Sequence, residues 1–389
     1  MTLSVSALAA PAAASPAPDY ELPFPCGQQW TGTTRSTHRP SPLSVDFNRP
    51  DDLGDLAVSA APGVVSQVGD AGDTSYGKWV RVDHGDGHQS LYAHLLATWV
   101  TVGQPVDQGA GLGLVGDTGG VTGAHLHFEE RLAGTVQQSY FHGTSYVFGT
   151  TVASQNCPDV PLTGDWDGDG SDEVAVFRRT GRGIFELSSP DGTVQTISHG
   201  LGSDAPLAGD WDGDGRTDVG VRRQRSRAFL MRLADGTTNR VPLGMRADVP
   251  VTGDWDGDST TDIGVWRPVT ARFRLLQADG TPRVVQLGRV GSQPLTGDWD
   301  GDGRTDLGVF DASTVTFTLR TESGDGTVAV RSVAFGAATD LPVAGDWNGD
   351  GISDVGTWSP STAMFSLRTA PASGRATAIV TSFPFGRAR

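Results

Sequence analysis

The strongest constraint on this chain is a seven-residue segment that recurs five times in its second half. It reads Gly-Asp-Trp-Asp-Gly-Asp-Gly at Gly164 and returns, with small changes, at Gly209, Gly253, Gly297 and Gly345, a period of 44 to 48 residues. Each unit has an entry strand, the Asp-rich loop, an apolar strand, a strand carrying phenylalanine, and a last strand after a turn. Four short strands per repeat at this period are typical of propeller blades.

Five units predict a closed five-bladed propeller, because a closed ring leaves no exposed sheet edge between its ends. An open array, or a larger ring completed by a second chain, is the alternative. The recurring aromatic residues, such as Trp166 and Phe185 in the first unit, are interpreted as core residues. A blade face must be buried before a repeat of this kind is stable.

The Asp-rich loops are candidate calcium sites, because carboxylate oxygens in a glycine-turned loop are the ligands that Ca²⁺ prefers. The loops resemble those of FG-GAP, or VCBS-like, propellers, which implies up to five structural calcium ions. A metal-free Asp-Gly turn is the alternative, and Ser259 in place of glycine makes the third loop the weakest candidate. The oxygen-bearing residues at loop positions 1, 3, 5 and 9 are Asp165, Asp167, Asp169, Glu173; Asp210, Asp212, Asp214, Asp218; Asp254, Asp256, Asp258, Asp262; Asp298, Asp300, Asp302, Asp306; and Asp346, Asn348, Asp350, Asp354.

In the first half of the chain, the stretch Gly-Ala-His-Leu-His-Phe-Glu at 123–129 carries the clearest chemistry. Successive side chains of a strand point to opposite faces, so His125 and His127 share one face while the residues between and after them turn toward a core. Two imidazoles on one face suit one metal ligand and one proton-handling group. A pair of surface histidines is the alternative, because short motifs also match by chance.

Partners for this pair come from two other segments. His38 precedes Asp46 by eight residues with two prolines between them, so this segment is a loop and the helical zinc motif H-E-x-x-H is absent. His94 lies in a strand pattern at 92–95. Imidazoles with one carboxylate favour Zn²⁺ over Ca²⁺ or Mg²⁺, and a catalytic zinc site keeps one position for water.

Three segments together resemble the lysostaphin-like M23 zinc metallopeptidases: residues 38–47, residues 82–95 and residues 122–129. They follow one another in the order that the family shows, and the resemblance covers roughly Cys26 to Cys157. It implies an antiparallel β-sheet domain and endopeptidase action on peptide stems or cross-bridges of bacterial peptidoglycan.

The resemblance also implies a role for each residue: His38, Asp46 and His127 would hold one zinc ion, and His94 and His125 would serve catalysis. The chain departs from the family at two points. The family usually has three residues between its first histidine and the aspartate, whereas this chain has seven. Some members also carry a tyrosine shortly before the first ligand, and this sequence has none there.

Cys26 and Cys157 are the two cysteines of the chain. In an exported protein such a pair favours a disulfide, whereas a zinc site of thiolates would need more cysteines at closer spacing. The bridge would close a loop of about 130 residues, worth roughly 4 to 5 kcal/mol in the chain-entropy model. It would join the ends of a peptidase domain at 26–157, followed by the propeller at 158–389.

The start of the chain predicts export. Residues 1–14 form a short apolar run ending in small residues, as in the remnant of a secretory signal peptide, and the Pro- and Ala-rich residues 15–25 are interpreted as a linker. No run approaches the roughly 20 apolar residues that a membrane span needs. The formal charge of -16 repels phosphate backbones and excludes a nucleic-acid partner.

The sequence therefore predicts an all-β, secreted zinc metalloendopeptidase of the cell wall, with a calcium-binding propeller for targeting or stability. Its expected partners are peptidoglycan peptides and, for the propeller, a cell-wall glycan or protein. The main alternative is a non-catalytic cell-wall-binding or adhesion protein with a calcium-stabilised propeller. A third reading keeps the hydrolase and moves its target to extracellular Gly-rich proteins.

Overall fold

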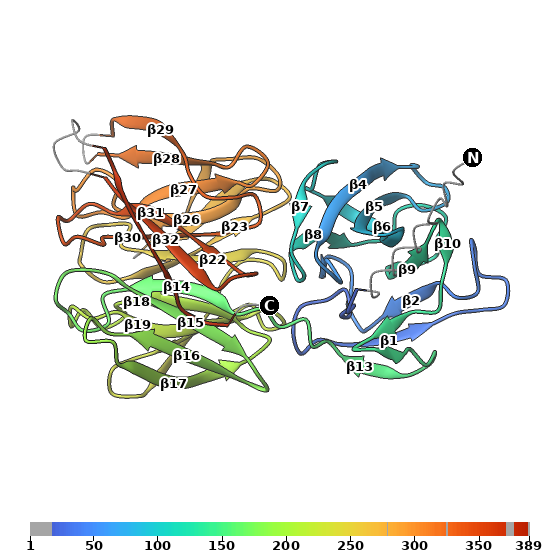
Figure 1. Cartoon of the computed structure of the whole chain (residues 1–389). Helices are drawn as coiled ribbons and strands as arrows, with labels where there is room; N and C mark the ends of the chain where they lie inside the picture. Colours follow the sequence, from blue (N-terminus) through green and yellow to red (C-terminus); the bar gives the residue numbers. More distant parts are fainter. Residues whose placement is uncertain (1–17, 278, 324–325, 371–376, 388–389) are drawn as a thin grey trace, which may run out of the picture.

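The computed structural model describes residues 18–277, 279–323, 326–370 and 377–387. Figure 1 shows two β-sheet bodies side by side, the first built from β1–β13 and the second from β14–β33. The ordered elements of these residues are strands, and the expected all-β class is confirmed. Across the described ranges no helix is long and apolar enough to cross a membrane. The predicted signal remnant at 1–14 lies outside them.

The first body is an 11-stranded antiparallel sheet with the path β13-β1-β2-β9-β6-β5-β4-β7, joined by β3, β8 and β10, and a small hairpin of β11 and β12. Its strands are β1 (Gln29–Thr33), β2 (Val45–Asn48), β3 (Leu56–Val58), β4 (Gly63–Asp70), β5 (Lys78–Gly85), β6 (His88–Thr98), β7 (Pro105–Val106), β8 (Gly111–Val115), β9 (Leu126–Leu132), β10 (Thr135–Val136), β11 (Tyr140–Phe141), β12 (Thr144–Ser145) and β13 (Thr151–Ala153). The strands β2, β9 and β6 are neighbours, so the three sequence segments with candidate site residues meet in the middle of one sheet.

The core of this domain includes part of the segment 15–25, for which the composition predicts a linker. Tyr20, Leu22 and Phe24 are buried in the same apolar cluster as the strands of the sheet. The Phe24 ring stacks on Trp30, with ring centroids 3.7 Å apart. The alternation of apolar residues at 20, 22 and 24 buries one side of an extended segment, so these residues form part of the core instead of a linker.

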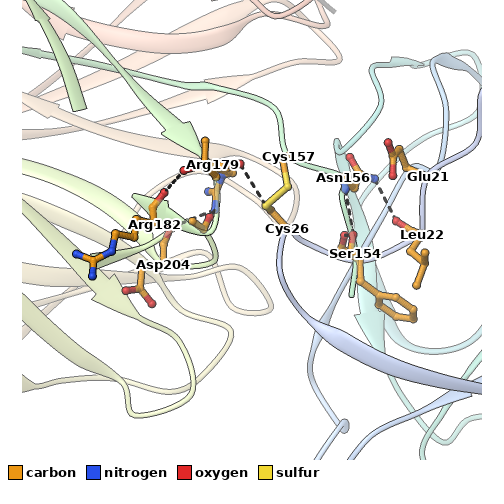
Figure 2. Close-up of a disulfide and its surroundings, with 12 residues drawn as sticks. Glu21, Leu22, Cys26, Ser154, Asn156, Cys157, Arg179, Arg182 and Asp204 are labelled. Carbon is orange, nitrogen blue, oxygen red and sulfur yellow. Dashed lines mark hydrogen bonds between the residues drawn. A yellow bond between two sulfur atoms is a disulfide. The ribbon is translucent and has the colours of Figure 1, made fainter. Parts of the chain in front are cut away.

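The expected disulfide between Cys26 and Cys157 is present. Figure 2 places it between the two bodies, with Ser154 and Asn156 of the first domain on one side and Arg179 of the propeller on the other. Asn156 donates from its side chain to the Leu22 carbonyl oxygen at 3.3 Å, which fastens the end of the domain to its beginning.

The second body consists of five antiparallel sheets of four strands, each in simple chain order from inner to outer strand. The strands are β14 (Val160–Gly164), β15 (Glu173–Arg179), β16 (Arg182–Ser188), β17 (Val194–Leu201); β18 (Ala205–Gly209), β19 (Asp218–Arg223), β20 (Ala228–Arg232), β21 (Thr238–Pro242); β22 (Val249–Gly253), β23 (Asp262–Arg267), β24 (Arg272–Leu276), β25 (Pro282–Gln286); β26 (Gln293–Gly297), β27 (Asp306–Asp311), β28 (Thr316–Glu322), β29 (Val328–Ala334); and β30 (Leu341–Gly345), β31 (Asp354–Ser359), β32 (Met364–Thr369), β33 (Ile379–Pro384). The five repeats read from the sequence are these five blades.

The ring of blades is closed. The inner strand β14 of the first blade contacts β18 of the second and also β30 of the fifth. The amide of Asp346 donates to the Asp172 carboxylate and the amide of Asp172 donates to the Asp346 carbonyl oxygen, both at 2.7 Å, across this closing joint. At the end of the fifth blade, the Arg387 amide donates to Asp159 at 3.1 Å. The prediction of a closed five-bladed propeller is therefore confirmed.

The recurring aromatic residues form the blade cores, as expected from the need to bury each blade face. The phenylalanine of the third strand is fully buried in every blade, and Trp166, Trp255 and Trp299 are also buried. The five phenylalanines are Phe185, Phe229, Phe273, Phe317 and Phe365. Their burial against neighbouring strands gives each blade a core of its own, shared in part with the next blade.

Ser259 in the third Asp-rich loop has a left-handed backbone conformation, and the equivalent residue of the other loops is glycine. Its φ is 68°, and the equivalent Gly170 and Gly215 have φ of 92° and 83°. A left-handed backbone costs a non-glycine residue about 1–2 kcal/mol, while glycine loses more entropy on folding. We therefore expect Ser259→Gly to raise the free energy of unfolding by about 0.5–1 kcal/mol.

Chemical denaturation of the full chain measures this effect. Ser171→Gly is the matched control, because Ser171 is a partly exposed loop serine whose hydroxyl donates to Asp169 at 2.6 Å. That substitution should leave stability unchanged or lower it. A loss of stability in Ser259→Gly as large as that in the control would contradict the backbone argument.

Candidate active site and metal centre

The register between β2 and β9 assembles the centre of the site. Asp46 lies directly opposite His127, and Phe47 lies opposite Leu126. Directly opposed residues share a face of the sheet, so the two polar side chains point to one side and the apolar pair enters the core. The division of faces that the sequence pattern predicts for residues 125–128 is the one that the structure has.

The Asp46 carboxylate is shared by three histidines. Its Oδ1 lies 3.0 Å from His127 Nδ1, 3.1 Å from His38 Nε2 and 3.6 Å from His125 Nε2. Burial opposes the ionisation of Asp46, but hydrogen bonds with His127 and His38 outweigh it and hold the pKa of Asp46 well below its usual range. The longer loop between His38 and Asp46 therefore still brings the two residues together.

Thr34 fixes the ring of His38. The Thr34 hydroxyl donates to the Pro42 carbonyl oxygen at 2.8 Å and lies 3.2 Å from His38 Nδ1. Because the hydroxyl proton is used, Thr34 accepts from an Nδ1–H of His38. When a metal ion replaces the hydrogen bond between His38 Nε2 and Asp46, the proton stays on Nδ1 and the Nε2 lone pair can bind the ion.

Glu129 fixes the ring of His127, just as Thr34 fixes the ring of His38. His127 Nε2 lies 2.9 Å from Glu129 Oε1, and the Glu129 side chain is fully buried. The hydroxyl of Tyr76 donates to the same oxygen at 2.7 Å, and Arg131 Nε lies 2.8 Å from Oε2. Burial raises the pKa of Glu129, but the contact with His127 and these partners outweigh it and lower that pKa. An ionised Glu129 keeps a proton of His127 on Nε2, so that Nδ1 can exchange its contact with Asp46 for a metal ion.

The sequence motifs predict no role for Glu129 or Tyr76. A signal for Glu129 is present, because positions 125, 127 and 129 alternate onto one face of β9. Tyr76 lies in the loop before β5, and no spacing in the sequence links it to the histidines.

The donor atoms fit a zinc ion. His38, Asp46 and His127 each offer one donor atom, and the three atoms lie within 4.8 Å of one another. Ligands about 2.0–2.1 Å from a tetrahedral zinc lie roughly 3.3 Å apart, close to the separations around Asp46. Two imidazoles and one carboxylate, with an outer carboxylate behind one imidazole, are a donor set typical of catalytic zinc.

His94 reaches the site through a break in the regular alternation of β6. Ala93 is paired with His127 and Tyr92 with Phe128, so simple alternation would turn His94 toward the core with Tyr92. The pairing with β5 shifts register at this point and His94 has a φ of 63°, in the left-handed region. Such a bulge re-aims a side chain, and here it places the His94 ring 4.8 Å from that of His125, measured between centroids.

His94 and His125, the two histidines of the site that are not candidate ligands, each have a lone pair on Nε2. His94 Nδ1 lies 2.9 Å from the Thr118 carbonyl oxygen, and His125 Nδ1 lies 3.0 Å from that of Gly123. A carbonyl oxygen only accepts, so each Nδ1 carries the proton and each Nε2 is the free acceptor. Burial lowers the pKa of His94 to about 4, with repulsion from His125 acting in the same direction. The site thus combines three candidate ligands with two imidazoles whose Nε2 atoms can accept a proton.

The Asp-rich loops lie between the first and second strands of the blades. In the first loop, Asp165 accepts the backbone amides of Gly168, Asp169 and Gly170 at 2.6 to 3.1 Å, and the first aspartate of the second, third and fifth loops accepts the three equivalent amides. In the fourth loop, Asp298 accepts the amides of Asp300, Gly301 and Gly303. Four loops hold groups of three carboxylates whose donor atoms lie within 4.8 Å of one another. These groups are Asp165, Asp167, Glu173; Asp210, Asp212, Asp214; Asp254, Asp256, Asp262; and Asp298, Asp300, Asp302.

Comparison with known proteins identifies the first domain. Residues 44–139 match the model of Peptidase family M23, a range that includes Asp46, His94, His125 and His127 and begins after His38.

Curated relatives match the same part of the chain. The cell division protein DipM of Caulobacter vibrioides is 45% identical over 84 residues, which are 22% of this chain and 14% of that protein. The DD-carboxypeptidase/endopeptidase Mpg of Neisseria meningitidis is 39% identical over 90 residues, 23% of this chain and 20% of that protein. The peptidoglycan DD-endopeptidase ShyA of Vibrio cholerae is 45% identical over 53 residues, 14% of this chain and 12% of that protein. The chain thus spans a fifth or less of the length of these relatives.

The role of Glu129 behind His127 is testable by metal affinity. We expect Glu129→Gln to weaken zinc binding about 10- to 100-fold, because the neutral amide no longer fixes the His127 tautomer as firmly. Competition with a chromophoric zinc chelator measures the dissociation constant.

Glu130→Gln is the matched control for this substitution. Glu130 is the next residue on β9, is buried, and accepts the Tyr140 amide at 2.9 Å, a bond that glutamine can keep. Equal zinc affinity in the wild type and Glu129→Gln would show that Glu129 does not orient a ligand.

Proposed function

Because the first domain is a peptidase family M23 domain, we propose that the chain is a zinc metalloendopeptidase that cleaves peptide stems or cross-bridges of bacterial peptidoglycan. The observation that carries this proposal is the convergence of His38, Asp46 and His127 on one point, with His94 and His125 beside it. Relatives named as peptidoglycan endopeptidases support the substrate class.

In this proposal His38, Asp46 and His127 hold the ion, and Glu129 and Thr34 fix the imidazole tautomers. When bound, zinc lowers the pKa of a coordinated water and polarises a carbonyl oxygen. The Nε2 atoms of His94 and His125 are the groups of this chain that can accept a proton from water and return it to a leaving amine. The carbonyl oxygens of Thr118 and Gly123 hold these two rings in place.

We further propose that the chain acts outside the cytoplasm. Peptidoglycan lies there, and the disulfide between Cys26 and Cys157 belongs to an oxidising compartment. The apolar residues 1–14, which resemble a signal remnant, agree with export.

The catalytic assignment is tested by fragment release from purified peptidoglycan. We expect His94→Ala and His125→Ala each to slow release by about 10²- to 10⁴-fold, the usual contribution of a general acid or base. Zinc content, measured by elemental analysis, should stay near one ion per chain because neither residue is a proposed ligand.

His88→Ala is the matched control, since His88 begins β6 in the same domain and lies outside the site. Full activity of the His94→Ala protein would overturn the proposal. A wild-type chain that binds no zinc and releases no fragments would favour a wall-binding protein instead.

For the propeller we propose up to five structural calcium ions in the Asp-rich loops, with the propeller serving wall targeting or stability. Burial raises the pKa of Glu173 and Asp218 to about 7, and neighbouring carboxylates in each loop act in the same direction. Groups that resist ionisation because like charges crowd them gain most from a divalent cation.

Calcium should therefore stabilise the propeller. Bound at 100 times its dissociation constant, one ion adds about 2.7 kcal/mol, so we expect 1 mM Ca²⁺ to raise the unfolding midpoint by several degrees relative to chelator. Calorimetry measures both the midpoint and the stoichiometry.

Loop and control variants locate the effect. Asp167→Asn should weaken one site, whereas Asp191→Asn, in an exposed hairpin turn, should change nothing. No bound calcium and no shift in the midpoint would show that the loops are metal-free turns.

A further inference from the structure

The two domains meet around a hollow. A cavity of about 490 Å³ lies between the channel mouth of the propeller and the face of the first domain that carries Trp99. On the propeller side it is lined by the beginnings of the inner blade strands, including Pro161, Pro250 and Pro342. Because the centre of the interface is open, contacts at its rim must set the orientation of the domains. One rim contact is the hydrogen bond from Gln28 to Gln224, at 3.0 Å.

The second blade carries an arginine where the other four carry an aromatic residue. Arg222 on β19 is paired with Phe229, and the residues paired in the same way with the recurring phenylalanine of other blades are Phe177, Trp266, Phe310 and Trp358. Arg222 is only 2% exposed. Arg222 therefore departs from the blade pattern. Because a buried guanidinium is costly without hydrogen bonds, we expect it to have a specific partner.

The partner of Arg222 is the loop 243–248, which connects the second blade to the third. Arg222 Nη1 donates to the Asp248 carbonyl oxygen at 2.8 Å, and Nη2 donates to those of Leu243 and Met245 at 3.2 and 2.5 Å. Three carbonyl oxygens of one short loop are therefore held by one side chain. The buried arginine therefore binds this loop at its beginning, its middle and its end.

The loop 243–248 also carries Arg246, which reaches the first domain. The Arg246 guanidinium donates to the Asp51 carbonyl oxygen, and its Nη1 lies 3.4 Å from Asp55 Oδ1. The Asp55 side chain is fully buried, and its other oxygen binds Arg49 Nε at 2.6 Å. Asp55 thus joins the propeller loop to the segment 49–55, and without Arg246 this buried carboxylate would keep only Arg49 as its charged partner.

From Asp55 the contacts run to the candidate catalytic residues. The Val115 amide donates to the Asp55 carbonyl oxygen at 2.7 Å, and the Gly54 amide donates to that of Val115 at 2.8 Å. The next residue, Gly116, accepts the backbone amide of His125 at 3.1 Å. Arg49, on the other side of Asp55, directly follows β2, the strand that carries Asp46. The loop 49–55 thus supports both halves of the site.

We propose that Arg246 of the propeller is a positioning residue for the peptidase site, and that the propeller is part of the catalytic assembly as well as an attached module. Arg222 holds the loop that carries Arg246, and Arg246 holds Asp55. Through the hydrogen bonds between Asp55, Val115 and Gly116, this contact fixes the backbone to which the His125 amide is bonded. This inference rests on the proposed function for its activity readout, but the clamp itself is independent of the reaction.

Steady-state cleavage of a soluble peptidoglycan peptide by the full chain tests the proposal. Misplacement by about 1 Å can cost up to 10²-fold in rate, so we expect Arg246→Ala to lower kcat about 10-fold or more with KM and zinc content little changed. Arg246→Lys keeps the charge beside Asp55 and should restore part of kcat. Arg240→Ala, an exposed arginine on β21 of the same blade, should behave as wild type.

Hydrogen exchange separates this inference from the proposed function. In Arg246→Ala, amide exchange at 49–55 and 113–126 should rise about 10-fold, while exchange in the blades is unchanged. Wild-type kcat together with unaltered exchange in both segments would overturn the clamp. Faster exchange in a chain whose wild type cleaves nothing would instead sustain the clamp and reject the proposed peptidase activity.

Discussion

The pairing of Asp46 with His127 across β2 and β9 is the contact on which the site depends. A shift of one residue in this register would turn Asp46 toward the core and Val45 or Phe47 toward the histidines. The apolar residues on both strands prevent the slip, because Val45, Phe47, Leu126 and Phe128 are fully buried. The core of the domain and the geometry of its polar cluster are therefore fixed by the same pairing.

Much of the fold could be predicted from the sequence because it follows from short-range patterns. The fivefold repeat predicts the propeller, the alternation at 125–128 predicts which residues share a face, and the two cysteines predict the disulfide. The sequence does not reveal the bulge at His94, because a left-handed residue within a strand has no signature in the alternation. The burial of Tyr20 is also hard to predict, because the Pro- and Ala-rich composition of residues 15–25 indicates a linker and obscures the period-two pattern of apolar residues.

The two domains are organised differently: the propeller repeats one unit, and the peptidase domain does not. Polar contacts such as those of Arg246 join them. The propeller is stable through repetition, so a single departure such as Arg222 stands out against four equivalent positions. In the peptidase domain each polar residue occurs once, and its role appears only from its neighbours. Tyr76 illustrates this, since its hydroxyl binds Glu129 while its carbonyl oxygen accepts the His94 amide at 2.9 Å. Docking between the domains depends on three-dimensional proximity and has no local sequence signal.

We propose that this register builds one zinc centre from His38, Asp46 and His127 and leaves His94 and His125 unligated. X-ray absorption at the zinc edge, combined with anomalous diffraction to place the ion, tests it most directly. We expect one zinc beside Asp46, with two imidazole nitrogens at about 2.0–2.1 Å and oxygen ligands completing four-coordination. A zinc ion bound through His94 or His125, or a loaded crystal with no anomalous peak beside Asp46, would contradict it.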